Sequence, residues 1–149
     1  MIPFYRARLS SGKITAVDYS SKMIEIARSK HPENGCPAVE YVVSDLYDLE
    51  YDGEYDLAVC YSCFPHFVDK EGALRKLRSC VRAGGRVVIA HSSSADCINN
   101  VHRERGEEIS LDILPRMSEL TLMMHDVGLD AVFTRDDDEF YICISERRG

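Results

Sequence analysis

The sequence has 149 residues, which fits one domain, and 45% of them are hydrophobic, enough to build a core. The net charge of -7 argues against binding to a phosphate backbone, which needs a clustered basic face. No apolar run approaches the roughly 20 residues of a membrane span, and Arg6 and Arg8 fall where a signal peptide would be apolar. We therefore expect a single cytoplasmic domain over residues 1–149 that binds neither nucleic acid nor membrane.

The first third of the chain predicts strand, helix and strand. Residues 13–17 (KITAV) form a β-rich run closed by Asp18, and Ser20 or Ser21 can cap the helix that follows. Residues 39–43 (VEYVV) predict a second strand that ends at Ser44 and Asp45. The next stretch, residues 45–56, holds six carboxylates and no basic residue, which is typical of a solvated loop.

The middle of the chain repeats this alternation. Residues 57–60 predict a third strand, followed by a loop through Pro65 and a helix from about Asp69 that we expect Gly84 and Gly85 to stop. Residues 86–90 (RVVIA) predict a fourth strand, nearly all apolar, as expected of a strand covered on both faces. Residues 92–110 form a polar insert, predicted to be helical from Ser94 to about residue 105.

The C-terminal part predicts a helix opened by Pro115 and ended by Gly128, then an antiparallel hairpin of residues 131–135 and 139–145. The predicted class is α/β, with a mostly parallel sheet, right-handed crossovers and this hairpin at one edge. Ligands of such sheets bind beyond the carboxyl ends of the strands. The places to look are therefore Asp18, Asp45, residues 60–66 and His91.

Five segments in order resemble class I S-adenosylmethionine-dependent methyltransferases. They are AVDYSSKMIEIAR, SDLYDLEYDGEYDLAVC, FPHF with the helix after it, VRAGGRVVIAHS, and the C-terminal GL and FYICIS hairpin. The resemblance covers nearly the whole chain. It implies a Rossmann-like methyltransferase sheet, S-adenosylmethionine as cofactor and a small-molecule substrate.

The resemblance also implies roles for individual residues. It makes Asp18, with Tyr19 beside it, the acid that accepts both ribose hydroxyls, and it makes Asp45 the acceptor of the adenine amino group. Met23 would flank the adenine and Leu46 would supply a backbone N–H and an apolar wall. Cys60 and Tyr61 fall where the family places residues near the sulfonium and methionine moiety.

Each of these residues also has a plainer interpretation. On this interpretation Asp18 belongs to the turn that enters the helix, and Asp45 belongs to a solvated loop. Met23 would pack in the core, and Cys60 would pack at the end of its strand. The sequence favours the ligand roles for the two acids and leaves the alternatives open for Met23 and Cys60.

The family's first strand and Gly-rich cofactor loop would lie before residues 2–10, which resemble the tail of the helix that follows that loop. The family places that strand at the centre of its sheet, so residues 13–17 and 57–61 would have unpaired edges, which invite pairing with another chain. Three explanations remain open: truncation at an internal Met, completion by a partner such as a second copy in a homodimer, or a degenerate relative. We favour the first two.

Two histidines are candidates for a base that removes a proton from the methyl acceptor. His66 follows the third strand and His91 ends the fourth, so both lie at the expected ligand face, although a lone loop histidine is more often inert. Asn99 and His102 share a helix face that could turn towards His91. His66, His91 and His102 could then form a metal site, but no closely spaced histidine pair supports it, and a polar lid helix is the plainer interpretation.

The six cysteines are expected to be reduced, since most lie in apolar or helical patterns. Cys60 and Cys63 form a CxxC motif, which can indicate redox activity or metal binding. A zinc ribbon requires a second such pair, which the sequence lacks. We expect Cys60 to be buried and Cys63 to lie in the loop, and we do not favour redox activity.

The leading hypothesis is a methyltransferase whose acceptor pocket is built from residues 61–67 and the polar insert. The second is a non-catalytic methyltransferase-like protein that dimerises through exposed strand edges. The third is a metal- or cofactor-binding module built on His66, His91 and His102.

Overall fold

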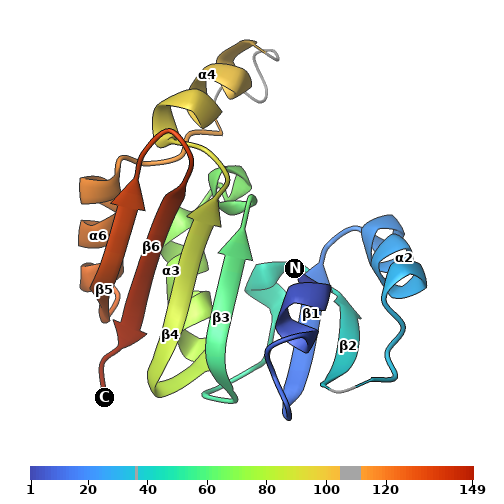
Figure 1. The fold of residues 1–149 in the computed structure, drawn as a ribbon. Coiled ribbons are helices and arrows are strands. Elements are labelled where there is room, and N and C mark those ends of the chain that lie inside the picture. Colours follow the sequence, from blue (N-terminus) through green and yellow to red (C-terminus); the bar gives the residue numbers. More distant parts are fainter. Residues whose placement is uncertain (36, 105–111) are drawn as a thin grey trace. The chain divides into compact units, whose positions relative to one another are not determined.

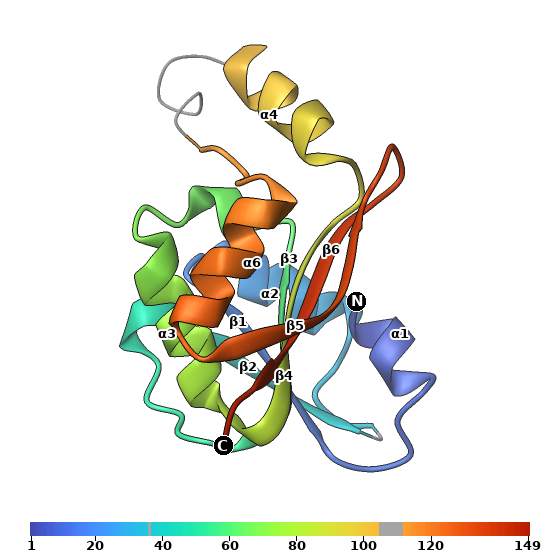
Figure 2. The same ribbon diagram turned by 90° about the vertical axis from the view of Figure 1, so that its left-hand side faces the viewer.

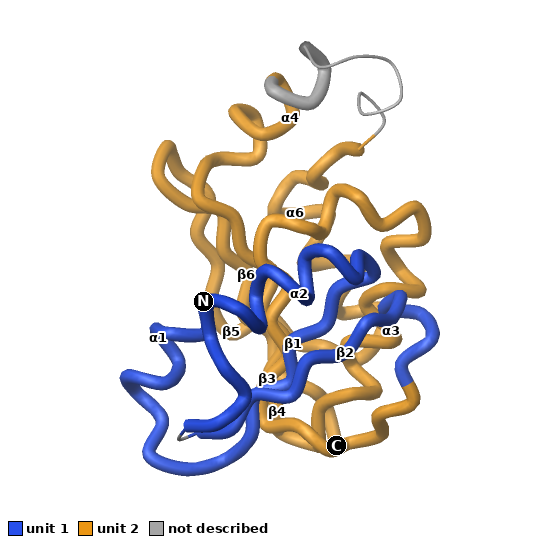
Figure 3. Tube along the Cα trace, turned by 90° about the vertical axis from the view of Figure 1, so that its right-hand side faces the viewer, with its two compact units in different colours: residues 1–49 blue, residues 50–149 orange. Residues whose placement is uncertain are grey.

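A computed structural model describes residues 1–35, 37–104 and 112–149, with backbone only for residues 101–104. The chain divides into two compact units (Figure 3): residues 1–49, the first unit, and residues 50–149, the second unit. The expectation of one domain over the whole length stays a prediction. No helix in the described part of the chain is long and apolar enough to cross a membrane.

The first unit is built around a pair of parallel strands (Figure 1). Its elements are α1 (Ile2–Arg6), β1 (Lys13–Asp18), α2 (Ser21–Lys30), β2 (Ala38–Val43) and the short 3-10 helix η1 (Leu46–Asp48). As predicted, Ser20 caps α2, because its hydroxyl oxygen accepts the Met23 N–H. The buried cluster of this unit is small and consists of Ile24 from α2 with Val39 and Tyr41 from β2.

The second unit contains a four-stranded mixed sheet in the order β3-β4-β6-β5. Its elements are β3 (Tyr55–Tyr61), the 3-10 helix η2 (Phe64–His66), α3 (Lys70–Cys80), β4 (Val81–His91), α4 (Ala95–Glu104), α6 (Met117–Asp126), β5 (Leu129–Asp136) and β6 (Tyr141–Arg147). Strands β3 and β4 are parallel, whereas β6 is antiparallel to both β4 and β5. The predicted C-terminal antiparallel hairpin is therefore present, at one edge of the sheet.

Two helices, α3 and α6, cover one face of this sheet (Figure 2). Alternate residues of the paired strands are fully buried, for example Val87 and Ile89 in β4 and Cys143 in β6. The helices contribute Leu74 from α3 and Leu120 from α6, which are also fully buried. The second unit thus has a larger buried core than the first, because two helices and four strands contribute to it.

One predicted helix end is wrong. Helix α3 ends at Cys80, and Gly84 and Gly85 lie inside β4 rather than after the helix. Gly84 has φ 72°, and the pairing of β4 with β3 shifts register in this region. A glycine in a strand commonly marks such an irregularity, because it tolerates backbone angles that other residues avoid. The two glycines thus shape the start of the strand.

The start of α6 also differs from the expectation. The helix begins at Met117, two residues after Pro115. The Glu119 carboxylate accepts the Arg116 N–H at 3.0 Å, so a side chain in the first turn fixes this end. The predicted end of the helix before Gly128 is confirmed, and that glycine has φ 83°.

Candidate functional site

The carboxyl ends of β1 and β2 lie side by side in the first unit. The register pairs Asp18 with Val43, and the Ser44 N–H donates to the Asp18 carbonyl at 3.1 Å. Asp45 follows two residues after the end of β2. Parallel pairing therefore brings the two predicted adenosine-binding acids to one edge of the strand pair, which is where open parallel sheets bind ligands.

Both acids also shape the turns in which they lie. One oxygen of the half-buried Asp18 accepts the Ser20 N–H at 2.8 Å, and one oxygen of the exposed Asp45 accepts the Tyr47 N–H at 3.1 Å. The plainer turn roles are therefore observed. A carboxylate has about four lone-pair sites, so one backbone contact leaves capacity for ligand hydroxyl or amino groups. The ligand roles of both acids stay predictions.

The other predicted ligand residues of the first unit follow these acids in the chain. Tyr19 is 82% exposed and Met23 is 52% exposed. Met23 is therefore not a core residue, which was the alternative interpretation of it. Leu46 is half-buried in η1. All three side chains are therefore at least partly accessible to a ligand.

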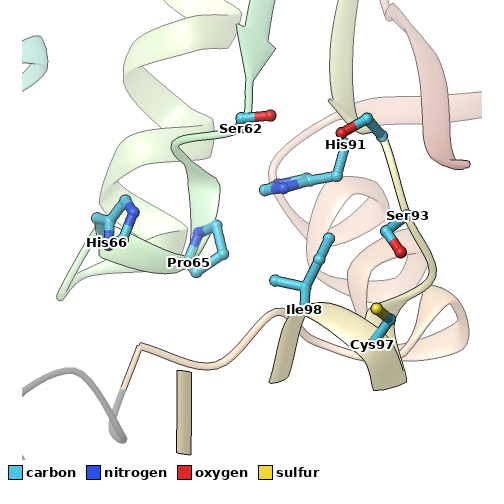
Figure 4. Close-up of a pocket in the computed structure, with 8 residues that line it drawn as sticks. Ser62, Pro65, His66, His91, Ser93, Cys97 and Ile98 are labelled. Atoms are coloured by element: carbon cyan, nitrogen blue, oxygen red, sulfur yellow. The ribbon is translucent and has the colours of Figure 1, made fainter. Parts of the chain in front are cut away.

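The second unit has a pocket of about 230 Å³ at the carboxyl ends of β3 and β4. The loop after β3, the end of β4 and the start of α4 all contribute to its walls (Figure 4). The lining side chains include Ser62, Pro65, His66, His91, Cys97 and Ile98. The structure therefore brings both predicted base candidates, His66 and His91, to one pocket between the 61–67 loop and the polar insert.

His91 is the more enclosed of the two histidines. It is the last residue of β4, is 4% exposed, and its ring extends into the pocket in Figure 4. Its ring meets the Tyr141 ring edge-on, with centroids 6.1 Å apart. Tyr141 in turn donates its hydroxyl to the Pro115 carbonyl at 2.9 Å, and burial raises the pKa of Tyr141. The ring of His91 thus packs against a buried, hydrogen-bonded residue of the core.

His66 is about half exposed and pairs with an acid that the sequence did not single out. Its Nδ1 lies 2.5 Å from the Oδ2 of Asp112. Lys70 supports the same loop by donating to the carbonyls of Pro65 and Phe67, both at 3.1 Å. Burial lowers the pKa of Lys70, and the nearby Asp112 opposes that effect. An acid on one ring nitrogen of a histidine fixes the tautomer and the orientation of the ring.

The metal hypothesis gains no support from the described residues. Among them, no group of three or more His, Cys, Asp and Glu side chains could hold an ion. The side chain of His102 lies outside the described residues. Asn99 is buried and exchanges two hydrogen bonds with the backbone of Leu114, at 2.8 and 2.9 Å. This residue therefore acts as the lid-helix alternative predicts, by satisfying loop backbone groups.

Cys60 is 3% exposed near the end of β3, and Tyr61 after it is 45% exposed. The Cys60 sulfur lies 3.0 Å from the Cys63 sulfur. The hydrogen bond with Cys63, together with burial, holds the pKa of Cys60 well above its usual value. Strand-end packing of Cys60 is observed, and its predicted place near the cofactor's sulfonium stays a prediction.

The elements of both units are those of a Rossmann-like α/β fold of the kind found in methyltransferases. Residues 3–89, more than half of the chain, match the family model described as Methyltransferase domain. The chain therefore belongs to the class I S-adenosylmethionine-dependent methyltransferase family.

Similar proteins include enzymes that methylate different atoms. The chain is 27% identical over 121 residues to the ubiquinone/menaquinone biosynthesis C-methyltransferase UbiE of Vibrio campbellii, covering 78% of this chain and 45% of that protein. It is 27% identical over 134 residues to the O-methyltransferase cnsE of Penicillium expansum, covering 87% of this chain and 48% of that protein. The chain thus spans about half the length of these curated relatives.

A solved structure supports the fold. The chain superposes with a TM-score of 0.80 on the structure of a complex between the Haloferax volcanii Trm112 methyltransferase activator and a putative methyltransferase. The match has 17% sequence identity and covers 99% of this chain and 77% of the other. At this identity the likeness establishes the fold alone.

Proposed function

We propose that this chain is a methyltransferase for a small-molecule acceptor, that Asp18 and Asp45 of the first unit hold the adenosine of S-adenosylmethionine, and that the pocket of the second unit is the candidate acceptor site. The observation that carries the proposal is the placement of Asp18 and Asp45 at one strand edge, within a chain of the methyltransferase family. Paired acids at the ends of adjacent parallel strands suit a nucleoside, because a carboxylate accepts two hydroxyl hydrogens at once.

The bound cofactor supplies an electrophilic methyl group on a sulfonium. The chain's own residues then have two tasks, to align the acceptor and to take up a proton where the acceptor is an oxygen or a carbon acid. His66 suits the second task, because it lines the pocket and Asp112 holds its Nδ1, which fixes the tautomer of the ring. His91, whose ring packs against Tyr141, also lines the pocket and is the second candidate base.

Calorimetry with S-adenosylhomocysteine, the demethylated product, tests cofactor binding. We expect the chain to bind it in the micromolar range, and Asp18→Ala to weaken binding by about 10- to 100-fold, the equivalent of one or two charge-assisted hydrogen bonds. Asp52→Ala is the matched control, because Asp52 is an exposed acid in the next turn and has no predicted ligand role. Absence of heat, or equal loss in both variants, would refute the proposal.

A separate measurement tests the role of Asp112 as a residue that positions His66. Nitrogen-15 NMR distinguishes the two neutral forms of an imidazole. We expect the Nδ1–H form of His66 in the parent chain, because the Asp112 carboxylate accepts that hydrogen, and a shift towards the Nε2–H form in Asp112→Ala. The same form in both proteins would show that Asp112 does not orient the ring.

Homodimer formation also stays part of the proposal. In the described residues β3 is an outer strand of its sheet, and Leu57 on it is 43% exposed. An exposed apolar edge strand favours pairing with another chain. Light scattering during gel filtration should show a dimer for the parent and a monomer for Leu57→Lys, since an edge lysine opposes pairing. A monomeric parent would refute this part of the proposal.

A further inference from the structure

The CxxC motif places two thiols against each other beside the pocket. Cys60 is buried near the end of β3, whereas Cys63 lies in the following loop and is half-buried. Their sulfur atoms are 3.0 Å apart. Effective concentrations between groups held at such a distance are high, so a reaction between them needs little rearrangement of the chain.

We propose that Cys60 and Cys63 form a reversible dithiol–disulfide pair that responds to peroxide and constrains the wall of the pocket. The other described cysteines do not share this arrangement: Cys80 and Cys143 are buried in the core, and Cys97 is exposed on α4. This inference concerns the chain's own thiols and does not depend on cofactor binding or methyl transfer.

The reaction has two steps. The Cys63 thiolate attacks one oxygen of hydrogen peroxide, the O–O bond breaks, and the hydroxide released takes up a proton to give water and a sulfenic acid. The Cys60 sulfur then attacks the Cys63 sulfur, the S–O bond breaks, and the hydroxyl leaves as water with the Cys60 proton. In total two thiols lose two electrons and two protons, and one peroxide becomes two water molecules.

The environments of the two sulfurs suit these separate roles. Cys63 is the one that solvent reaches, and oxidants attack accessible thiols first. Cys60 is buried and hydrogen-bonded to Cys63, and its raised pKa keeps it a thiol, so its proton passes to the departing hydroxyl as the S–S bond forms. Burial protects Cys60 from direct oxidation, and proximity makes it the resolving partner.

The loop between the two cysteines connects this chemistry to the pocket. Ser62 lies between them, lines the pocket, and has φ 56°, which is unusual for a residue other than glycine. Its N–H donates to the Ala90 carbonyl at 2.9 Å, one residue before His91. A disulfide closing this four-residue segment would restrict Ser62 and reduce the freedom of the wall that carries Pro65 and His66.

Peptide mapping tests the proposal directly. The reduced chain is treated with hydrogen peroxide, the remaining thiols are alkylated, and chymotrypsin cleaves after Tyr61, between the two cysteines. We expect the peptides on either side of that cleavage to stay joined by a disulfide, and to separate after dithiothreitol. Cys97→Ser is the control and should give the same joined product, since Cys97 lines the pocket and is exposed but lies outside the CxxC motif.

Three results would overturn the proposal: both cysteines fully alkylated after peroxide, a disulfide that joins Cys63 to Cys97, or irreversible oxidation of Cys63 alone. Cys60→Ser supplies a further check, because loss of the resolving thiol should convert Cys63 to higher oxides. Hydrogen exchange of the Ser62 amide should slow at least tenfold in the oxidised chain. An unchanged rate would show that the disulfide does not constrain the pocket wall.

Discussion

The two units end their strands with different chemistry. In the first unit, β1 and β2 lead into turns that carry Asp18 and Asp45, each bonded to a backbone N–H only two residues away. In the second unit, β3 and β4 lead to His66 and His91, which line a pocket and contact residues about 50 positions further along, Asp112 and Tyr141. Local turns shape the first site, and tertiary packing shapes the second.

The largest expected difference between the units is in stability. Leu74→Ala in the second unit should lower the free energy of unfolding by about 3 kcal/mol, since it leaves a cavity under a fully buried side chain. Ile24→Ala in the first unit should cost about 2 kcal/mol, because its cluster is smaller and collapses more easily.

Hydrogen exchange separates the two effects. Ile24→Ala should accelerate exchange in β1 and β2 and leave it unchanged in β4 and β6. Leu74→Ala should accelerate exchange in β4 and β6 and leave it unchanged in β1 and β2. Equal acceleration in all four strands for either variant would mean that the units do not have separate cores.

The next effect concerns Asp45, which has both an observed and a proposed role. Asp45→Ala should weaken S-adenosylhomocysteine binding by about tenfold, because the adenine amino group loses its acceptor. Asp69→Ala is the matched control: Asp69 also caps a helix, by accepting the Gly72 N–H at 2.8 Å, but that helix is α3 of the second unit. Its loss should cost about 1 kcal/mol of stability without changing affinity. An equal loss of affinity in both variants would show that Asp45 acts only as a helix cap and does not bind the adenine.

A smaller effect should appear at alkaline pH in the second unit. Burial raises the pKa of Tyr141 above its usual 10.0, so the folded chain holds this proton more tightly than the unfolded chain. The stability that this gives is complete below about pH 10 and is lost as the pH rises further. Urea unfolding of Tyr141→Phe should therefore show a shallower alkaline decline than the parent. Parallel declines would assign the effect to the other groups whose pKa values burial raises, the buried thiols and the tyrosines of the first unit.

Much of the fold could be predicted from the sequence, because its signals are local. The cap at Ser20, the helix that starts after Asp69 and the C-terminal hairpin follow from short patterns, and the structure contains all three. Gly84 and Gly85 misled the prediction, because glycine marks both helix ends and strand irregularities, and the pairing with β3 decides which occurs.

The candidate site could be predicted only in part. His66 and His91 could be predicted as site residues, because the sequence shows that they follow or end predicted strands, and ligands bind at the carboxyl ends of strands in such sheets. Asp112 gave no such signal, since 46 residues separate it from His66 and only packing brings them together. The closeness of the Cys60 and Cys63 sulfurs likewise depends on the backbone at Ser62, which the spacing of the motif does not determine.

The central claim is that the first unit binds the cofactor and the second unit serves the acceptor. Calorimetry with S-adenosylhomocysteine on two variants tests it most directly. The account predicts that Asp18→Asn weakens binding at least tenfold, because one carboxylate oxygen becomes an amide donor, and that His66→Gln leaves the affinity within about twofold of the parent. A larger loss of affinity in His66→Gln than in Asp18→Asn, or an equal loss in both variants, would contradict the division of roles between the two units.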